Sequence, residues 1–280
     1  MKLKILGSGG GEGYPAAFCR CAHCDAARRA GGKNLRTLSQ SLIDDSLMID
    51  LPSDTGVHLF SEGVSLGDIE NIFITHTHAD HYYPNIFELR GNVFARNMKY
   101  EKVNVYGNSE VKRLFDGIFS LYPIHEDVRK NIWFVEAVPY EKIQAGKYTV
   151  TPLPARHAPD QLALNYVVED EKSSLLYLLD SGYPEEATLA RIGAFGKPFG
   201  CVVMDGTMGE ALPGAYAYHM GFEENIRLKQ RLINDGAADA ATKFVVTHIT
   251  HNGAGLHESI QAILSPCGIT TAYDGIELEF

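Results

Sequence analysis

The residues with the clearest chemical meaning are a cluster of histidines and one aspartate. Residues 76–81 read HTHADH, which places three imidazoles and a carboxylate within six positions. In an extended stretch, His76 and His78 point to the same side because side chains alternate with a period of two. Asp80 and His81 require a turn, so their side chains can face a second point nearby. One segment can therefore offer two ligands to each of two adjacent metal ions.

Three residues further along the chain can complete such a pair of sites. His157, Asp180 and His248 follow short apolar stretches, and strand ends at one edge of a sheet bring distant segments together. Taken singly, each has an ordinary structural interpretation; Asp180, before Ser181-Gly182, suits a turn or helix cap. Taken together, they supply the number of donors that two divalent ions need, about four each with one carboxylate shared.

A separate metal site is indicated by a C-x-C-x2-C cluster near the start of the chain. Its three thiols are Cys19, Cys21 and Cys24. Such close cysteines, without a secretion signal, favour a structural zinc over a disulfide framework. Zinc needs a fourth ligand. His23 lies inside the motif, where ligation would be strained, so His251 is the better candidate because it follows His248 by three residues.

Composition limits the remaining possibilities. The chain has 280 residues, 45% hydrophobic and 21% charged, which is ordinary for a globular protein with a core. The net charge of −10 argues against a long nucleic-acid partner but allows a small anionic substrate at a local positive centre. No apolar run of about 18 residues occurs, so no membrane span is expected. The apolar stretch after Met1 is too short for a signal peptide, which favours a cytoplasmic location.

The expected elements alternate strands with helices and contain no linker, which predicts one domain over residues 1–280 with a zinc loop at 19–24. Strands are expected at 2–6, 38–43, 47–50, 70–75, 103–106, 148–153, 162–168, 175–179, 201–204 and 244–247. Helices are expected at about 22–31, 84–97, 108–120, 184–194, 221–235 and 256–264. The glycine-rich loop at 7–15 lacks a dinucleotide fingerprint, because Glu12 stands where the last glycine belongs. It is expected to form a wall beside the metal site.

The HTHADH segment, followed in order by His157, Asp180 and His248, resembles the metallo-β-lactamase superfamily. The resemblance spans residues 1–251 and implies an α/β fold, a four-layer αβ/βα sandwich with metals at one edge. It implies one metal bound by His76, His78 and His157, and a second bound by Asp80, His81 and His248, with Asp180 bridging. Asp50 matches the superfamily's early aspartate and is expected to orient a metal-bound histidine.

Two branches of the superfamily combine these features. The cysteine loop together with Thr247-His248-x-x-His251 resembles the cyclic phosphodiesterases of the carbon–phosphorus lyase pathway and, less closely, protein B of pyrroloquinoline quinone biosynthesis. The intact HTHADH segment favours the first branch, whereas the loop from Gly7 to Pro15 resembles the second. In the phosphodiesterases a histidine precedes the last metal ligand. His219 fits that position, as the group that protonates the leaving alkoxide or binds developing charge.

The resemblance implies a binuclear metal-dependent hydrolase, with a phosphodiesterase favoured. In that reaction a metal-bridging hydroxide opens a small, cyclic phosphate ester, with His219, Asp80 and Asp50 as catalytic residues. Zinc or manganese is expected in the active site; nickel and iron remain open, because the order of metal affinities is general. The cysteine site is expected to hold one structural zinc.

Four other functions remain open. They are hydrolysis of a carbon ester, lactone or thioester; transfer-RNA 3′ processing, which the acidic balance opposes; a redox role in cofactor biosynthesis; and non-catalytic binding. The roles of Asp205, Tyr82, Tyr83 and Arg156 stay open at this stage. So does the oligomeric state, although relatives of this kind are often homodimers.

Overall fold

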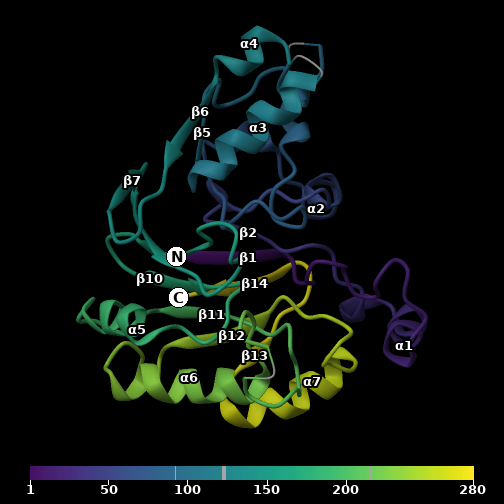
Figure 1. The fold of residues 1–280 in the computed structure, drawn as a ribbon, viewed down its shortest axis with the longest axis vertical. Helices are drawn as coiled ribbons and strands as arrows, with labels where there is room; N and C mark the ends of the chain where they lie inside the picture. The colour runs from purple at the N-terminus through teal and green to yellow at the C-terminus, as the bar shows by residue number, and fades with distance from the viewer. Residues whose placement is uncertain (92, 122–123, 215) are drawn as a thin grey trace.

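The computed structural model describes residues 1–91, 93–121, 124–214 and 216–280. Within these residues the chain forms two seven-stranded sheets. The first sheet has the order β14-β1-β2-β3-β4-β5-β6, and the second has the order β13-β12-β11-β10-β9-β8-β7. Figure 1 shows the two sheets packed on each other, with helices above and below them.

The strands of the first sheet are β1 (Lys2–Gly7), β2 (Gln40–Ile43), β3 (Leu47–Ile49), β4 (Asn71–Phe73), β5 (Val103–Gly107), β6 (Ile132–Glu136) and β14 (Ile276–Glu279). Those of the second are β7 (Ile143–Ala145), β8 (Tyr148–Pro154), β9 (Leu164–Glu169), β10 (Ser174–Leu178), β11 (Cys201–Asp205), β12 (Lys243–Thr247) and β13 (Thr270–Thr271). The α-helices are α1 (Ala22–Ala30), α2 (Thr55–Glu62), α3 (Ser109–Leu121), α4 (Glu126–Arg129), α5 (Glu186–Gly193), α6 (Phe222–Asn234) and α7 (His257–Leu264).

Three apolar cores separate four layers. The middle core joins the inner faces of the sheets, where Ile49 and Phe73 share a cluster with Tyr166 and Tyr177. A second core packs the outer face of the first sheet against α3, and a third packs the outer face of the second sheet against α5, α6 and α7. The protein is therefore an αβ/βα sandwich, as the sequence predicts.

One half of each sheet, up to one edge strand, is parallel. β3, β4, β5 and β6 run in one direction, and β10, β11, β12 and β13 do the same in the second sheet. β11 is buried on both faces, which explains its continuous apolar sequence. The carboxyl ends of parallel strands open at one edge of a sheet, where loops can gather side chains into a site.

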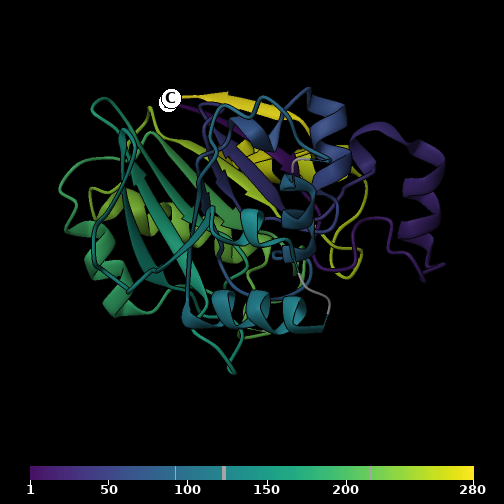
Figure 2. The same cartoon turned by 90° about the horizontal axis from the view of Figure 1, so that it is seen from above.

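The two ends of the chain lie together. β1 pairs with β14, and the amino group of Met1 donates to the carbonyl of Phe280 at 2.7 Å. The view in Figure 2 shows α1 set to one side of the sheets. No helix in the described ranges combines the length and apolarity needed to cross a bilayer.

One expected helix is wrong. In place of a helix over 84–97 there is a short 3₁₀ helix, η3 (Pro84–Arg90), followed by turns, with residue 92 outside the described residues. Gly91 has low helix propensity. Beyond it Val93 and Phe94 are exposed, so no buried face stabilises a continuation of the helix. The expected hairpin over 38–50 is confirmed as β2 and β3.

Candidate metal centre

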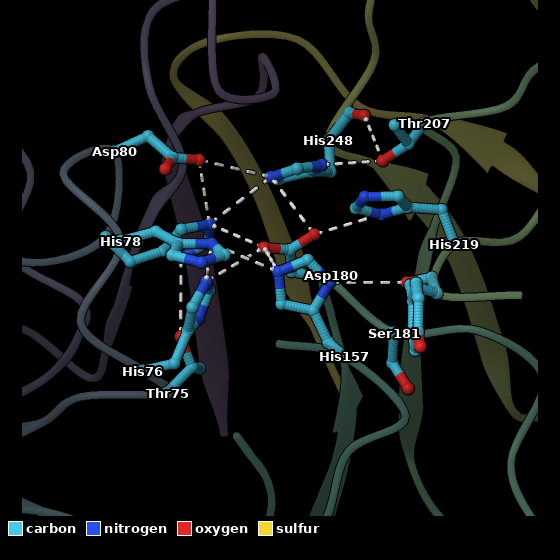
Figure 3. Close-up of polar contacts among 12 residues, drawn as sticks. Thr75, His76, His78, Asp80, His157, Asp180, Ser181, Thr207, His219 and His248 are labelled. Carbon is cyan, nitrogen blue, oxygen red and sulfur yellow. Dashed lines mark hydrogen bonds and ion pairs between the residues drawn. The ribbon is translucent and has the colours of Figure 1, made fainter. Parts of the chain in front are cut away.

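The predicted ligand residues meet where the parallel strands of both sheets end. Asp50 follows β3, the HTHADH segment follows β4, Asp180 follows β10 and His248 follows β12. Figure 3 shows the side chains of His76, His157 and His248 around the carboxylate of Asp180. Residues separated by more than 100 positions in sequence thus share one site because their strands end at the same edge.

The first group of donors consists of His76, His78, His157 and Asp180, whose ligand atoms all lie within 4.8 Å of one another. Nε2 of His76 and Nε2 of His157 each lie 3.2 Å from Oδ2 of Asp180. Nδ1 of His78 lies 2.9 Å from Nε2 of His76 and 3.2 Å from Nε2 of His157. Burial lowers the pKa of His157 to about 4, which favours the neutral imidazole that a metal ion binds.

The second group consists of Asp80, His81, His248 and the same Asp180. Nε2 of His81 lies 3.1 Å from Oδ2 of Asp80 and 3.2 Å from Oδ2 of Asp180. Nε2 of His248 lies 3.7 Å from Oδ2 of Asp80. Oδ2 of Asp180 therefore borders both groups. Burial opposes its charge, but the imidazoles of His248, His219 and His76 hold the pKa of Asp180 well below its usual range.

The first sheet orients two of these histidines through Asp50 and Thr75. Nδ1 of His81 donates to Oδ2 of Asp50 at 2.7 Å. Oγ1 of Thr75 donates to Asp50 at 2.9 Å and lies 3.1 Å from Nδ1 of His76. A hydroxyl has one proton, so Thr75 accepts from His76 while it donates to Asp50. Both imidazoles consequently carry their proton on Nδ1 and turn Nε2 towards the centre.

The second sheet contains an equivalent arrangement in Asp205 and Thr207. Oγ1 of Thr207 donates to Oδ2 of Asp205 at 3.0 Å and lies 2.7 Å from Nδ1 of His248. Asp205 ends β11 and is fully buried, and it also accepts from the backbone N–H of Met220 at 3.1 Å. Asp205 therefore acts on the site through Thr207, beyond fixing a local turn.

The donor set fits cations. With Nδ1 of His81 bonded to Asp50 and Nδ1 of His248 bonded to Thr207, the Nε2 atoms of the two rings face each other at 3.3 Å. Two lone pairs at that distance repel unless positive charge lies between them. Histidine and carboxylate donors in groups of four suit zinc and other divalent ions of the first transition series.

Three residues of the site have a strained backbone conformation. Asp50, Asp180 and His248 have φ of 65°, 49° and 62°, in the left-handed region that residues with a Cβ seldom adopt. Each lies just beyond a strand, where the chain turns sharply. The turn aims the side chain back over the end of its own sheet, and the surrounding bonds must hold that conformation.

His219 lies beside the two donor groups. Its Nδ1 is 3.0 Å from Oδ1 of Asp180 and 3.2 Å from Oδ2 of Asp205. Burial opposes a charge on this ring, yet Asp205 and Asp180 outweigh that effect and raise the pKa of His219 to about 10. Because Nδ1 faces the carboxylates, Nε2 is the atom left for a bound substrate.

The glycine-rich loop borders the second donor group. A Cβ on Gly10 would lie 3.2 Å from Nδ1 of His248 and 2.6 Å from a methyl carbon of Thr250. A Cβ on Gly11 would lie 3.3 Å from Oδ2 of Asp80. The loop thus lies against the site at the place where a wall was expected, and Gly10 leaves no room for a side chain.

The cysteine cluster lies beside the same loops. Its four members, Cys19, Cys21, Cys24 and His251, form a third group of donors. Nδ1 of His251 is 3.6 Å from Sγ of both Cys19 and Cys21, and its Nε2 faces Oε1 of Glu12 at 3.3 Å. The backbone N–H of Cys24 lowers the pKa of Cys21 to about 6, which favours the thiolate that zinc binds. His23 lies outside the group, with Nδ1 3.2 Å from the carbonyl of His251.

Several residues were unassigned or overlooked at the sequence level. The sequence reasoning misses Thr75, Thr207 and Glu12. For the two threonines, the available signal is a hydroxyl within two positions of a predicted ligand or strand-end aspartate. Tyr82 is buried in the core beneath η3, so its role is structural, whereas Tyr83 and Arg156 are exposed.

Comparison with known proteins agrees with the fold. A family model described as a beta-lactamase superfamily domain matches residues 57–249. No curated protein matches the sequence. A diphosphatase of the PhnP family is 22% identical with a TM-score of 0.74, over 100% of this chain and 97% of that one.

Two other solved structures are similar over their whole length. Zn(2+)-bound PqqB from Methylobacterium extorquens is 17% identical with a TM-score of 0.75, over 100% of both chains. The metallo-beta-lactamase fold protein YhfI from Bacillus subtilis is 18% identical with a TM-score of 0.71, over 100% of this chain and 99% of that one. At sequence identities of 17% to 22%, the structural similarity establishes the fold.

Proposed function

Because the chain belongs to the beta-lactamase superfamily and is a metal-dependent hydrolase, we propose that it is a phosphodiesterase with a binuclear centre that opens a small, cyclic phosphate ester. The observation that carries this proposal is the position of Asp180. One of its oxygens borders both donor groups, at 3.2 Å from Nε2 of His76 and from Nε2 of His81. A carboxylate in that position suits two cations that share a ligand.

The donor types favour a phosphate ester over a β-lactam. The second group contains oxygen and nitrogen donors from Asp80, His81 and His248, without a cysteine. When bound, a pair of divalent ions makes hydroxide available near neutral pH and stabilises charge on phosphoryl oxygens. The two carboxylates of Asp80 and Asp180 neutralise only half of the charge of two such ions. The site would therefore attract an anion, although the chain is acidic overall.

The chain supplies a proton for the leaving group through His219. Asp205 and Asp180 hold its Nδ1, so the carboxylate of Asp205, which ligates no ion in this proposal, favours the protonated ring. Nε2 can then give its proton to the departing alkoxide. Asp50 and Asp205 act indirectly, because they orient the histidines and keep their donor nitrogens turned towards the centre.

Neighbouring structures support a phosphorus substrate. One of them is a diphosphatase of the PhnP family. The cysteine group is proposed to hold one structural zinc, and the active site two ions of zinc or manganese, with nickel and iron as alternatives.

The net charge of −10 favours a small substrate over long nucleic acid.

The proposal is tested by hydrolysis with manganese-loaded protein. The substrates are a bis-aryl phosphodiester, 2′,3′-cyclic nucleotides, a ribose 1,2-cyclic phosphate, an aryl ester and a lactone. Activity on the phosphodiesters, lost in Asp80→Ala and kept in Asp68→Ala at an exposed position, supports the proposal. Activity confined to the ester or lactone would replace it with the carbon-ester alternative. If none of the five substrates is hydrolysed while metals are bound, a redox or binding role would be favoured.

A further inference from the structure

An exposed aromatic ring lies directly beside His219. The ring of Tyr216 is nearly parallel to that of His219, with 16° between the planes and 5.6 Å between centroids. His219 in turn lies nearly parallel to His248, at 19° and 6.0 Å. Tyr216 is 50% exposed. A series of rings thus leads from the candidate metal centre to solvent and ends in a tyrosine.

The chain after Tyr216 is held in place by several contacts. Nδ1 of His157 donates to the carbonyl of Tyr218 at 3.4 Å, and the N–H of Met220 donates to Asp205 at 3.1 Å. A Cβ on Gly182 would lie 2.0 Å from the carbonyl oxygen of Ala217, so these two backbones touch. The exposed ring is therefore carried by a segment that the site itself fixes.

The ring of Tyr216 borders the histidine that is proposed to protonate the leaving group. His219 turns Nδ1 towards Asp180 and Asp205, which leaves Nε2 for the departing oxygen. A leaving group that receives the proton of Nε2 lies next to His219, and Tyr216 is the exposed aromatic neighbour of that ring. The rings of Tyr216 and Tyr218 meet edge to face, with 5.6 Å between centroids and 79° between planes, and Tyr216 keeps half of its surface exposed.

We propose that Tyr216 determines substrate specificity by stacking on a planar aromatic ring carried by the leaving group, as in a nucleoside cyclic phosphate. The inference rests on the proposed function and names its substrate class. In such a substrate the departing hydroxyl and the base belong to one ribose, so protonation by His219 and stacking on Tyr216 can occur together. Stacking of a base on an aromatic side chain contributes about tenfold in affinity.

Two substrates with the same reacting bonds test this proposal. Adenosine 2′,3′-cyclic phosphate and methyl β-riboside 2′,3′-cyclic phosphate differ only in the base. We expect Tyr216→Leu to raise KM about tenfold for the adenosine substrate, with kcat nearly unchanged, and to leave KM for the riboside unchanged. Tyr216→Phe should behave as the unaltered protein. Leu212→Ala, at another exposed residue (79%), is the matched control.

The outcomes separate this inference from the function on which it depends. Equal effects of Tyr216→Leu on both substrates, or no effect on either, would overturn the role of Tyr216 and leave the phosphodiesterase intact. A loss in kcat alone would also overturn it, because stacking on the base predicts a change in KM. Failure of the unaltered protein to hydrolyse either substrate, or any other phosphodiester, would overturn both proposals.

Discussion

Nδ1 of His81 donates to Oδ2 of Asp50 across 2.7 Å, and both side chains are wholly buried. Asp50 also accepts from the N–H and the hydroxyl of Thr75 at 2.8 and 2.9 Å. Only a carboxylate can accept from this many donors. The relationship fixes the tautomer of His81, so that Nε2 presents a lone pair to the second donor group.

Asp50→Asn should weaken metal binding at the active site. The amide nitrogen of asparagine would face a donor, and His81 would lose its fixed orientation. We expect metal affinity to fall about 10- to 100-fold, which a competitive chelator titration measures. Asp45→Asn, in the exposed turn after β2, is the control. Unchanged affinity in Asp50→Asn would show that this carboxylate does not support the ligand.

Asp80→Ala should abolish hydrolysis while the protein stays folded. Its Oδ2 lies within 3.7 Å of Nε2 of both His81 and His248, so its loss removes the oxygen donor that only the second group has. Elemental analysis should still find about one zinc per chain, held at the cysteine group. Loss of the circular dichroism signal of the native fold would instead make the cluster structural.

His219→Gln should affect leaving groups unequally. A nitrophenolate departs without a proton, whereas a ribose alkoxide needs one. We expect kcat for a 2′,3′-cyclic nucleotide to fall about 100-fold or more, and kcat for a bis-nitrophenyl phosphodiester to fall less than about tenfold. Equal losses on the two substrates would exclude proton donation and leave charge binding as the role of His219.

Cys21→Ser should lower stability more than it lowers activity per folded molecule. Cys21 contacts His251 and caps α1, so a zinc bound there joins the start of α1 to the segment after β12. We expect a lower Tm and the loss of one zinc per chain, with Cys267→Ser as the control outside the group. An unaltered Tm with lost activity would make this metal catalytic.

His58 should make stability depend on pH. Its ring is 2% exposed, with Nδ1 2.6 Å from Oε1 of Gln40, and burial lowers its pKa below the ordinary 6.5. Between these two values the unfolded chain binds the proton and the folded one does not, so the contribution to stability is complete above about pH 6.5 and decreases below it.

The measurement is the denaturant midpoint with metal present, from pH 7.5 to 5. His58→Gln should show a smaller decrease than the unaltered protein, while His125→Gln, at an exposed histidine, should match it. Metal loss at acid pH affects all three proteins alike, so only the difference between them counts. A slope that His58→Gln leaves unchanged would contradict the prediction.

Which residues would meet at the candidate metal centre could be inferred from the sequence. The HTHADH segment is local, and its side-chain directions follow from strand and turn geometry over six residues. His157, Asp180 and His248 could be added because each follows an apolar strand, and parallel strands bring their carboxyl ends to one edge. The hairpin over 38–50 and helix α3 could be predicted for the same reason, because their sequence signals lie within the segments themselves.

The prediction of a helix over 84–97 is wrong because it depended on packing against other parts of the chain. Its apolar residues matched a helical period, but whether a face is buried depends on what packs there. In the folded chain Val93 and Phe94 meet solvent, and the helix ends at Arg90.

Only the tertiary structure decided which atoms act. Sequence could place Asp205 at a strand end, but its separation from His219, at 3.2 Å, depends on how the segment after β11 returns to the site. The same holds for Thr207 on Nδ1 of His248 and for Tyr216 beside His219. Residue type and local spacing are properties of the chain, whereas tautomer, shared ligand and substrate contact depend on distances between segments that only packing of the two sheets brings together.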